Sequence, residues 1–447
     1  MGENTGIFIE QDQNSKLSKT FGFSFFLTKA VWCGFLLLVF LLALLSPTIH
    51  LKSQNLALTD FIFPLIFTLW LIGILLRQFQ FRWHRFYWLM AFYLAAMILS
   101  TIFSPNFTQS ILKLTGGIYL LILAVLTFNL VRNEKDFKQV IFAWLIGTAV
   151  AVAVGIITIL LFYIQPQNRF LDYTTSIYGA VPVGNYPRLQ STFVSASMFC
   201  NYLTVSLAML FIAEKTKLIG KILFSVLYFS ILVCAVFTIS SGIGGIALFI
   251  GVWYWAIYRN SKKTLARLSL AGAFTSALLF SLMNCVALQV YSTAPYSIAV
   301  PFSEMILFPS PRFLVWTDSL KTFTENFFYG NGLGRPSCEV LFQNTDGNFS
   351  LLTDAHNTFL NVAAQNGIFG LLAIAVITLY FLRQTLYLKP AEDFSSITFA
   401  GLILAFLAAF VFQGLTGSFE DARHLWILIG LILSVEKKFL PTSRFIC

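Results

Sequence analysis

The residues whose chemistry stands out in this 447-residue chain are His356, Arg188 and Arg312. An imidazole titrates near pH 6.5, so at pH 7 it can accept a proton from a hydroxyl group. A guanidinium group stays charged and offers a fork of donors that suits a diphosphate. A histidine base beside two arginines fits a reaction in which a hydroxyl attacks and a diphosphate leaves, because the cations neutralise the charge that develops.

His356 stands directly before Asn357 and a long apolar run. Thr353 or Asp354 is expected to cap the helix that follows, which places His356 in its first turn. Two interpretations stay open at this point. His356 is either a general base or only a capping or interfacial histidine, and the spacing alone slightly favours the second.

The predicted helix 358–382 carries amides at every fourth position, at Asn357, Asn361 and Gln365, so they share one face. Amides in a bilayer are costly unless they face a bundle interior or a watered cavity. They serve either a site or helix packing alone. The opposite face carries small residues where another helix can approach closely, namely Ala363, Gly367 and Gly370.

Each arginine also has a simpler interpretation. Arg188 precedes the apolar run 192–213, on which Ser197, Asn201 and Thr204 form a polar stripe. Arg312 opens the segment R-F-L-V-W. A single arginine of this kind is commonly a lipid-headgroup anchor. Two arginines and a histidine in the long loops of one face favour a functional site.

Gly330-Asn331-Gly332-Leu333-Gly334 permits a tight turn, or the close approach of backbone amides to an anion. It matches no dinucleotide-binding or P-loop pattern, and no strand–helix unit surrounds it. The segment alone does not separate an anion site from a simple turn.

The composition predicts an all-α polytopic membrane protein, because 57% of the residues are hydrophobic and only 11% are charged. Soluble domains carry about 25% charged residues. We predict about 12 transmembrane helices. They lie near 30–48, 59–76, 86–103, 111–131, 139–163, 192–213, 219–239, 242–258, 265–286, 358–382, 396–416 and 424–436.

The distribution of basic residues predicts the orientation. With the N-terminus in the cytoplasm, most of the 29 lysines and arginines fall in inner segments. This also explains the net charge of +10 without a nucleic-acid partner. The expected division is a cytoplasmic tail 1–29, helices 1–9 over 30–286, a large periplasmic loop 287–357, helices 10–12 over 358–436 and a cytoplasmic tail 437–447. The first apolar run is expected to be an anchor and not a cleaved signal peptide.

The large outer loop between spans 9 and 10 is expected to be functional, because structureless loops of this length are uncommon. We expect a short helix over Phe313–Phe323 that lies over the bundle near the membrane surface. Its apolar stripe is expected to be buried and comprises Phe313, Trp316, Leu320 and Phe323.

Neither a metal nor a disulfide framework is expected. His50, His356 and His424 are far apart in sequence, and only Glu420 and His424 stand four residues apart, so a metal site is not predicted. The six cysteines form no C-x-x-C motif. Cys285 and Cys338 are the one pair that could meet outside the membrane.

Over about 188–380 the sequence resembles the bacterial O-antigen ligase and O-antigen polymerase superfamily. The resemblance is carried by R-x-x-S-T-F from Arg188, R-F-L-V-W from Arg312, Y-G-N-G-L-G, and above all A-H-N-T-F-L-x(6)-G-I-F-G. One departure is Ser241, where many relatives have an arginine, so the role of that arginine cannot be carried over.

The resemblance implies a metal-independent membrane glycosyltransferase without a cofactor. Its donor would be a glycan on undecaprenyl diphosphate at the outer face of the bacterial inner membrane, and its acceptor a lipid-linked or other glycan such as lipid A–core. His356 would activate the acceptor hydroxyl, and Arg188 and Arg312 would hold the diphosphate. The supporting residues in the matching motifs are Asn357, Gly332, Gly334, Gly367 and Gly370.

Other functions remain open. A polymerase that joins lipid-linked repeat units shares the motif, and a protein O-oligosaccharyltransferase belongs to the same class. The dominance of one outer loop favours the ligase. A secondary transporter is the alternative from a different class, but we find neither the paired repeats nor the broken helices typical of one.

Overall fold

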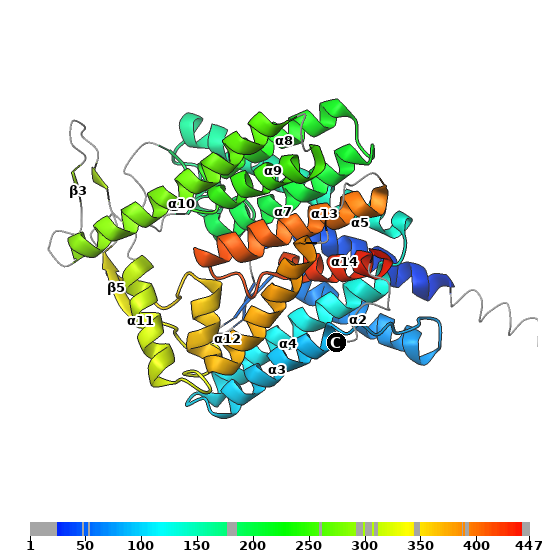
Figure 1. The fold of residues 1–447 in the computed structure, drawn as a ribbon, viewed down its shortest axis with the longest axis horizontal. Coiled ribbons are helices and arrows are strands. Elements are labelled where there is room, and N and C mark those ends of the chain that lie inside the picture. The colour runs from blue at the N-terminus through cyan, green and yellow to red at the C-terminus, as the bar shows by residue number, and fades with distance from the viewer. Residues whose placement is uncertain are drawn as a thin grey trace, which may run out of the picture.

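The computed structural model of the protein describes residues 25–46, 49–51, 54–176, 186–258, 262–291, 298–299, 306–307, 312–343, 349–386, 388 and 393–439. Within these ranges the chain is mainly helical, which agrees with the predicted class (Figure 1). Most of the predicted tails 1–29 and 437–447 lies outside the described residues.

Each predicted apolar segment coincides with a helix. The helices are Phe25–Leu41, α2 (Leu58–Leu75), α3 (Tyr87–Ile102), α4 (Phe107–Leu130), α5 (Glu134–Ile164), α7 (Ala196–Lys215), α8 (Lys221–Phe237), α9 (Ile243–Tyr258), α10 (Lys263–Tyr291), α12 (Thr358–Thr385), α13 (Phe394–Phe406) and α14 (Arg423–Phe439). Among the described residues, seven helices are long and apolar enough to cross a membrane, and four more are apolar but shorter.

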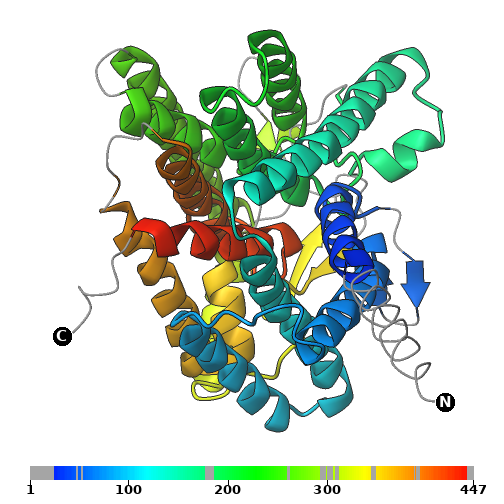
Figure 2. The ribbon, with the colours of Figure 1, turned by 90° about the vertical axis from the view of Figure 1, so that its right-hand side faces the viewer.

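The centre of the bundle is formed by α7, α13 and α14. Most side chains of α7 and α13 are buried, and so is the run Leu425–Ile429 of α14. In Figure 1, α14 lies between α3 and α4 on one side and α7 and α13 on the other. Figure 2 shows the same helix, in red, crossing the middle of the bundle. An apolar helix that is buried all round belongs to the interior of a bundle.

Helix α13 does not end regularly. It continues into a π-helix at Leu407–Phe412 and a 3-10 turn at Gln413–Leu415. Such π segments interrupt the regular ladder of backbone hydrogen bonds and are often found at functional sites. The irregular end leads into residues 416–422, which we call the 416–422 loop.

The loops contain short elements that the sequence analysis did not predict. Helix α6 covers Phe170–Thr174. Three antiparallel hairpins have strands of two to four residues, namely β1 (Ile49–Leu51) with β2 (Gln54–Leu56), β3 (Ile298–Ala299) with β4 (Ile306–Leu307) and β5 (Val340–Gln343) with β6 (Phe349–Leu352). In the last pair Val340 lies opposite Leu352.

The predicted helix in the long loop is present as α11 (Arg312–Glu325), which packs against α10 and α12. The predicted buried stripe is only partly right. Leu320 is 47% exposed, whereas Val315 and Ser319 are buried. The aromatic residue Trp316 lies 6.0 Å from Phe280 of α10, measured between ring centroids. The face that α11 buries is therefore rotated from the one that the aromatic spacing suggested.

Candidate functional site

His356 lies in a sharp turn immediately before α12. Its φ of 48° is in the left-handed region, which a non-glycine residue rarely adopts. Its backbone N–H donates to Oδ1 of Asp354 over 2.6 Å. The predicted cap was wrong, because Asn357 and not Thr353 or Asp354 caps the helix. The Asn357 side chain accepts from the N–H groups of Phe359 and Leu360. His356 is therefore held outside the helix and not in its first turn.

The 416–422 loop holds this turn in place. Ser418 Oγ donates to Asp354 Oδ1 over 2.7 Å, so one carboxylate oxygen receives donors from both segments. Thr358 donates to the Gly417 carbonyl through its backbone N–H and its hydroxyl, over 3.1 and 3.0 Å. Asn357 Nδ2 reaches the carbonyl of Leu415. The segments around residues 356 and 417 thus form one hydrogen-bonded unit.

Arg312, the first residue of α11, joins the same unit. Its Nη1 donates to the carbonyl of Thr416 and, over 3.4 Å, to the carbonyl of His356 itself. Burial, followed by the charge of Arg188, lowers the pKa of Arg312 to about 10, so the guanidinium remains charged at pH 7. The cation predicted to hold a phosphate is therefore bonded to the backbone of the predicted base.

Arg188 lies in the segment before α7, where Leu189 pairs with Thr175 and donates to the carbonyl of Phe237. Burial lowers the pKa of Arg188. Its charge also acts on both Arg312 and His356, which places the three predicted site residues within electrostatic reach of one another.

The electrostatics keep the imidazole of His356 neutral. Burial among the surrounding groups and the charges of Arg312 and Arg188 lower the pKa of His356 to about 4, and Asp354 opposes this. The imidazole is nevertheless partly exposed to solvent, since 41% of the side chain is accessible. Nδ1 lies 3.5 Å from Asp354 Oδ1. A carboxylate on this side favours the tautomer with its proton on Nδ1, which leaves Nε2 as a base.

Ser241, the position where relatives have an arginine, adjoins the unit. Its hydroxyl donates to Thr416 Oγ1 over 3.0 Å, and the Thr416 carbonyl is the one that Arg312 contacts. In this chain the position therefore carries a neutral hydroxyl, and this hydroxyl and Arg312 both bond to Thr416.

The predicted amide stripe of α12 exists and is hydrogen-bonded. Asn361 Nδ2 donates to Oε1 of Glu420 in the 416–422 loop. Gln365 Nε2 reaches Asn361 Oδ1 over 3.5 Å, and Gln365 Oε1 accepts from the backbone N–H of Gly334. These amides join α12 to two loops and do not pair it with another helix.

The glycine turn packs against α12. Gly330, Gly332 and Gly334 all have positive φ, and a Cβ on Gly330 would lie 2.2 Å from the carbonyl of Gln365. The N–H of Asn331 donates to the Ala364 carbonyl and the N–H of Gly332 to the Gln365 carbonyl. Two uses were considered for this turn, a tight turn and an anion site. The backbone N–H groups of residues 330–332 and 334 all donate to oxygens of the protein, so they are not directed at an anion.

Helix α12 is broken at Gly367, where φ is 66° and ψ is −160°. This corrects two expectations. The closest approach to Gly367 is made by the turn after α11 and not by a second helix, because a Cβ there would lie 2.3 Å from the backbone oxygen of Phe328. Also, a discontinuous helix is present after all. At Gly370 the nearest atom to an added Cβ belongs to Asn366 of the same helix, so that residue is not a helix-packing contact either.

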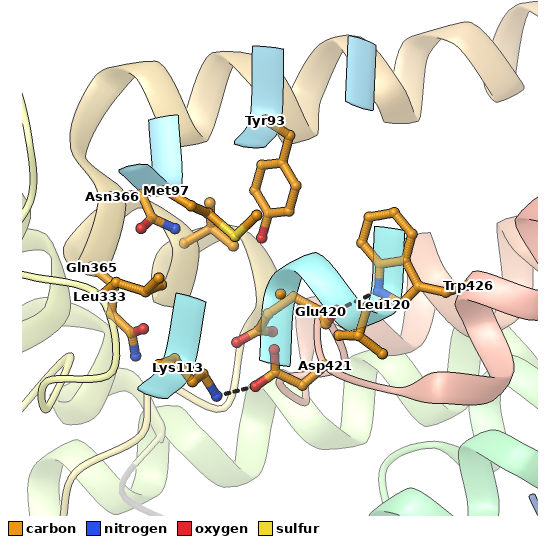
Figure 3. A pocket seen from close by; sticks show the side chains of 12 residues that line it. Tyr93, Met97, Lys113, Leu120, Leu333, Gln365, Asn366, Glu420, Asp421 and Trp426 are labelled. Atoms are coloured by element: carbon orange, nitrogen blue, oxygen red, sulfur yellow. Dashed lines mark hydrogen bonds and ion pairs between the residues drawn. The ribbon is translucent and has the colours of Figure 1, made fainter. Parts of the chain in front are cut away.

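The sequence did not indicate a small pocket beside this unit, which is lined by apolar side chains together with a few charged and amide groups (Figure 3). Lys113 of α4 forms an ion pair with Asp421 of the 416–422 loop, and Glu420 lies next to them. The signal was weak, because Lys113 and Asp421 are far apart in the sequence and the loop has no periodicity.

The other residues weighed for metal binding do not meet. Glu420 turns towards Asn361, whereas Nε2 of His424 pairs with Asn201 Oδ1 over 2.7 Å inside the bundle. Cys285 and Cys338 are free thiols and form no disulfide. The Cys338 thiol donates instead to the carbonyl of Leu352.

The family model described as O-antigen ligase matches residues 226–375. The matched segment includes Arg312, His356 and the break in α12, and Arg188 lies outside it. No curated protein matches the sequence. The family match and the apolar helices agree with the predicted resemblance and class. The match over residues 226–375 supports a place in the O-antigen ligase-like superfamily and a ligase- or polymerase-type function in general, and the apolar helices indicate a multi-pass membrane protein.

Proposed function

We propose that this protein transfers a glycan from undecaprenyl diphosphate to an acceptor hydroxyl during the synthesis of a cell-surface polysaccharide, as an O-antigen ligase. The observation that carries the proposal is the unit formed by His356, Arg312 and Arg188. A neutral, partly exposed imidazole lies within electrostatic reach of two half-buried cations, and one of these cations is hydrogen-bonded to the base's own carbonyl.

In the proposed reaction Nε2 of His356 accepts the proton of the acceptor hydroxyl. The hydroxyl oxygen forms a bond to the anomeric carbon of the donor sugar, and the bond from that carbon to the diphosphate oxygen breaks. Arg188 and Arg312 stabilise the negative charge that gathers on the diphosphate. Guanidinium groups supply this charge stabilisation, so the proposal includes neither a metal nor another cofactor. Transfer that persists in excess chelator would agree with it, and loss of transfer would contradict it.

The proposed location is the outer face of the bacterial inner membrane, with both termini in the cytoplasm. The excess of lysine and arginine in the loops of the opposite face supports this orientation. The diphosphate of a lipid-linked donor lies at the boundary of water and bilayer. A turn at the start of a membrane helix, like that of His356, is suited to reach it. Contact with membrane lipids follows from the exposed apolar helices.

A ligase with lipid A–core or a similar acceptor is preferred over a polymerase or a protein O-oligosaccharyltransferase, because a single outer loop dominates the sequence. Deletion of the gene separates the first two. Accumulation of lipid-linked polymer supports the ligase, whereas accumulation of single repeat units supports the polymerase.

The break in α12 raises the transporter alternative again, since broken helices bind substrates in many carriers. Here the backbone groups near the break are occupied by the protein. The N–H of Ile368 donates to the Phe327 carbonyl over 2.8 Å. The Gln365 carbonyl accepts from Gly332 N–H and from the Ser100 hydroxyl. These groups are not available to a transported substrate, which supports the enzyme.

The direct test is a transfer assay with purified protein, a lipid-linked glycan donor and a glycan acceptor. We expect product that depends on the protein and on the diphosphate-linked donor. Uptake of a glycan into vesicles without formation of a new glycosidic bond would overturn the proposal in favour of a carrier.

A further inference from the structure

Glu420 is a buried carboxyl group in the 416–422 loop, with 8% of the residue exposed. Its Oε1 accepts from Asn361 Nδ2, and its backbone carbonyl accepts from Trp426 Nε1 over 2.7 Å. Its Oε2 is fully buried and meets no hydrogen-bond donor among the described residues. A buried polar oxygen without a partner is costly, so this atom requires an explanation.

A second buried oxygen in the same place has the same need. Asn366, in the last turn of α12 before the break, is 2% exposed, and its Oδ1 also meets no donor in the described part of the chain. Both residues line a small pocket of about 20 Å³ between α3, α4, α12 and the 416–422 loop. A space of this size accommodates one water molecule. Figure 3 shows the hydroxyl of Tyr93 directed into the same space.

The charges around Glu420 favour its neutral form. Burial, with the charges of Asp421 and Asp354, raises the pKa of Glu420 to about 8, and Lys113 on α4 opposes this. Lys113 is already paired with Asp421. Tyr93 on α3 faces the pocket as a neutral phenol at pH 7. A neutral carboxyl group has an O–H donor that a carboxylate lacks. Such a donor on Oε2 would give a partner to a buried acceptor that lines the same pocket, such as Asn366 Oδ1, directly or through one water.

The two segments that form the pocket, the 416–422 loop and α12, also hold the residues of the candidate site. Glu420 belongs to the loop whose Thr416 carbonyl holds Arg312 and whose Ser418 hydroxyl holds Asp354. Asn361 and Asn366 belong to the part of α12 that follows His356 and the cap Asn357. The bond from Asn361 to Glu420 already joins the two segments that hold the base, and a bond from Glu420 to Asn366 would join them a second time.

We propose that Glu420 is a positioning residue, which as a neutral carboxylic acid joins the 416–422 loop to the first half of α12 and so holds His356 and Arg312 in their places. The proposal rests on the proposed function for its consequence in transfer. The protonation of the carboxyl group is independent of that function and can be measured without substrate.

The first experiment is infrared spectroscopy of the purified full-length protein in detergent. The wild type should show the carbonyl band of a buried, protonated carboxylic acid at pH 7, and the band should disappear around pH 8. Glu420→Gln should lack this band, and Glu325→Gln should keep it, because Glu325 on the exposed side of α11 is 61% exposed. A band that is absent from the wild type, or unchanged in Glu420→Gln, overturns the proposal.

The second experiment measures transfer from the lipid-linked donor as a function of pH. Glu420→Gln is neutral at every pH and still offers an acceptor and a donor, so it should retain transfer above pH 8, where the wild type declines. Glu420→Ala should lose about tenfold or more in kcat with little change in KM, because a buried hydrogen-bonding partner is removed.

The results of the two experiments separate the possible failures. A Glu420→Ala variant with unchanged kcat, or a Glu420→Gln variant that declines with pH as the wild type does, overturns the positioning role. If no preparation transfers glycan, the proposed function fails, and the infrared result still decides whether Glu420 is a neutral acid.

Discussion

The two halves of α12 differ sharply, although they form one continuous helix in the sequence pattern. The half before Gly367 buries amides such as Asn361 and Asn366, and its polar groups bond to two loops. The half after Gly367 buries apolar residues such as Ile374, Ile377 and Phe381, and Phe381 packs against Phe86 and Phe406. The first half organises a site, and the second half anchors it in the bundle.

The break explains how one element does both. A straight helix would satisfy its own backbone, and the glycine turn would have no groups to bond. Because the helix breaks at Gly367, the carbonyls of Ala364 and Gln365 accept from the turn at residues 331–332 instead of from the helix. The outer loop is therefore bonded directly to a membrane helix. We infer that rigidity of the site comes from these backbone bonds, whereas depth in the membrane comes from apolar packing. The following predictions test this division.

The largest effect is expected for His356→Ala. If His356 is the general base, its loss should lower kcat by about 10²–10⁴-fold, the usual contribution of such a group. Insertion into the membrane and donor binding should persist, because the cap belongs to Asn357. A transfer assay with a donor-binding control measures both. Transfer at the wild-type rate would leave His356 as a turn residue only, and His50→Ala serves as the matched control.

Arg312→Lys should have the next largest effect. Lysine keeps the charge but loses the planar fork, so it cannot hold the carbonyls of Thr416 and His356 and a diphosphate together. Hydrogen bonds to charged groups contribute about 1.5–3 kcal/mol, which corresponds to a loss of roughly 10–100-fold in kcat/KM. Arg169→Lys, at the exposed start of α6, should transfer normally. Equal activity of the two variants would argue that only charge matters at Arg312.

Gly367→Ala tests the division itself. The backbone at Gly367 is in a region that is nearly restricted to glycine, and a Cβ would lie 2.3 Å from the Phe328 oxygen. We expect a loss of about 1–3 kcal/mol in the free energy of unfolding, measured by thermal unfolding in detergent. Gly116→Ala on α4 is the control, since its Cβ would meet nothing within 4 Å. Equal stability of both variants would mean that α12 tolerates a regular helix at 367.

These predictions also mark what the sequence revealed and what it did not. The helices follow the apolar segments closely, because a membrane requires long apolar runs and the sequence displays them directly. The site residues His356, Arg312 and Arg188 were identified by their chemistry and by motif, and the structure brings them within electrostatic reach of one another. Their roles remain predictions.

Two of the errors share one physical cause. The break at Gly367 and the pocket of Lys113 and Glu420 depend on contacts between segments far apart in the chain, whereas the cap at Asn357 is a local bond that was placed on the wrong neighbour. Glycine is common in membrane helices, so Gly367 alone did not indicate a break. The 416–422 loop has no periodicity and no motif, yet it bonds to Arg312, Asp354 and α12. His424, which the sequence analysis weighed for metal binding, is buried in the bundle and bonded to Asn201.

The smallest expected effect is the most specific test of the electrostatics. His356 must be neutral to act as a base, and its pKa is lowered to about 4 by burial and by Arg312 and Arg188. As pH falls, activity should therefore persist through pH 6.5 and decline only near pH 4. At pH 5.5 an unperturbed histidine would leave roughly a tenth of the activity, whereas His356 should retain nearly all of it. The free-enzyme value governs kcat/KM, and the value in the complex governs kcat. A bound diphosphate favours the imidazolium, so the acid decline of kcat should lie at a higher pH than that of kcat/KM. If both decline together near pH 6.5, the two arginines do not act on His356, and the site loses the electrostatic feature that distinguishes it from an ordinary turn.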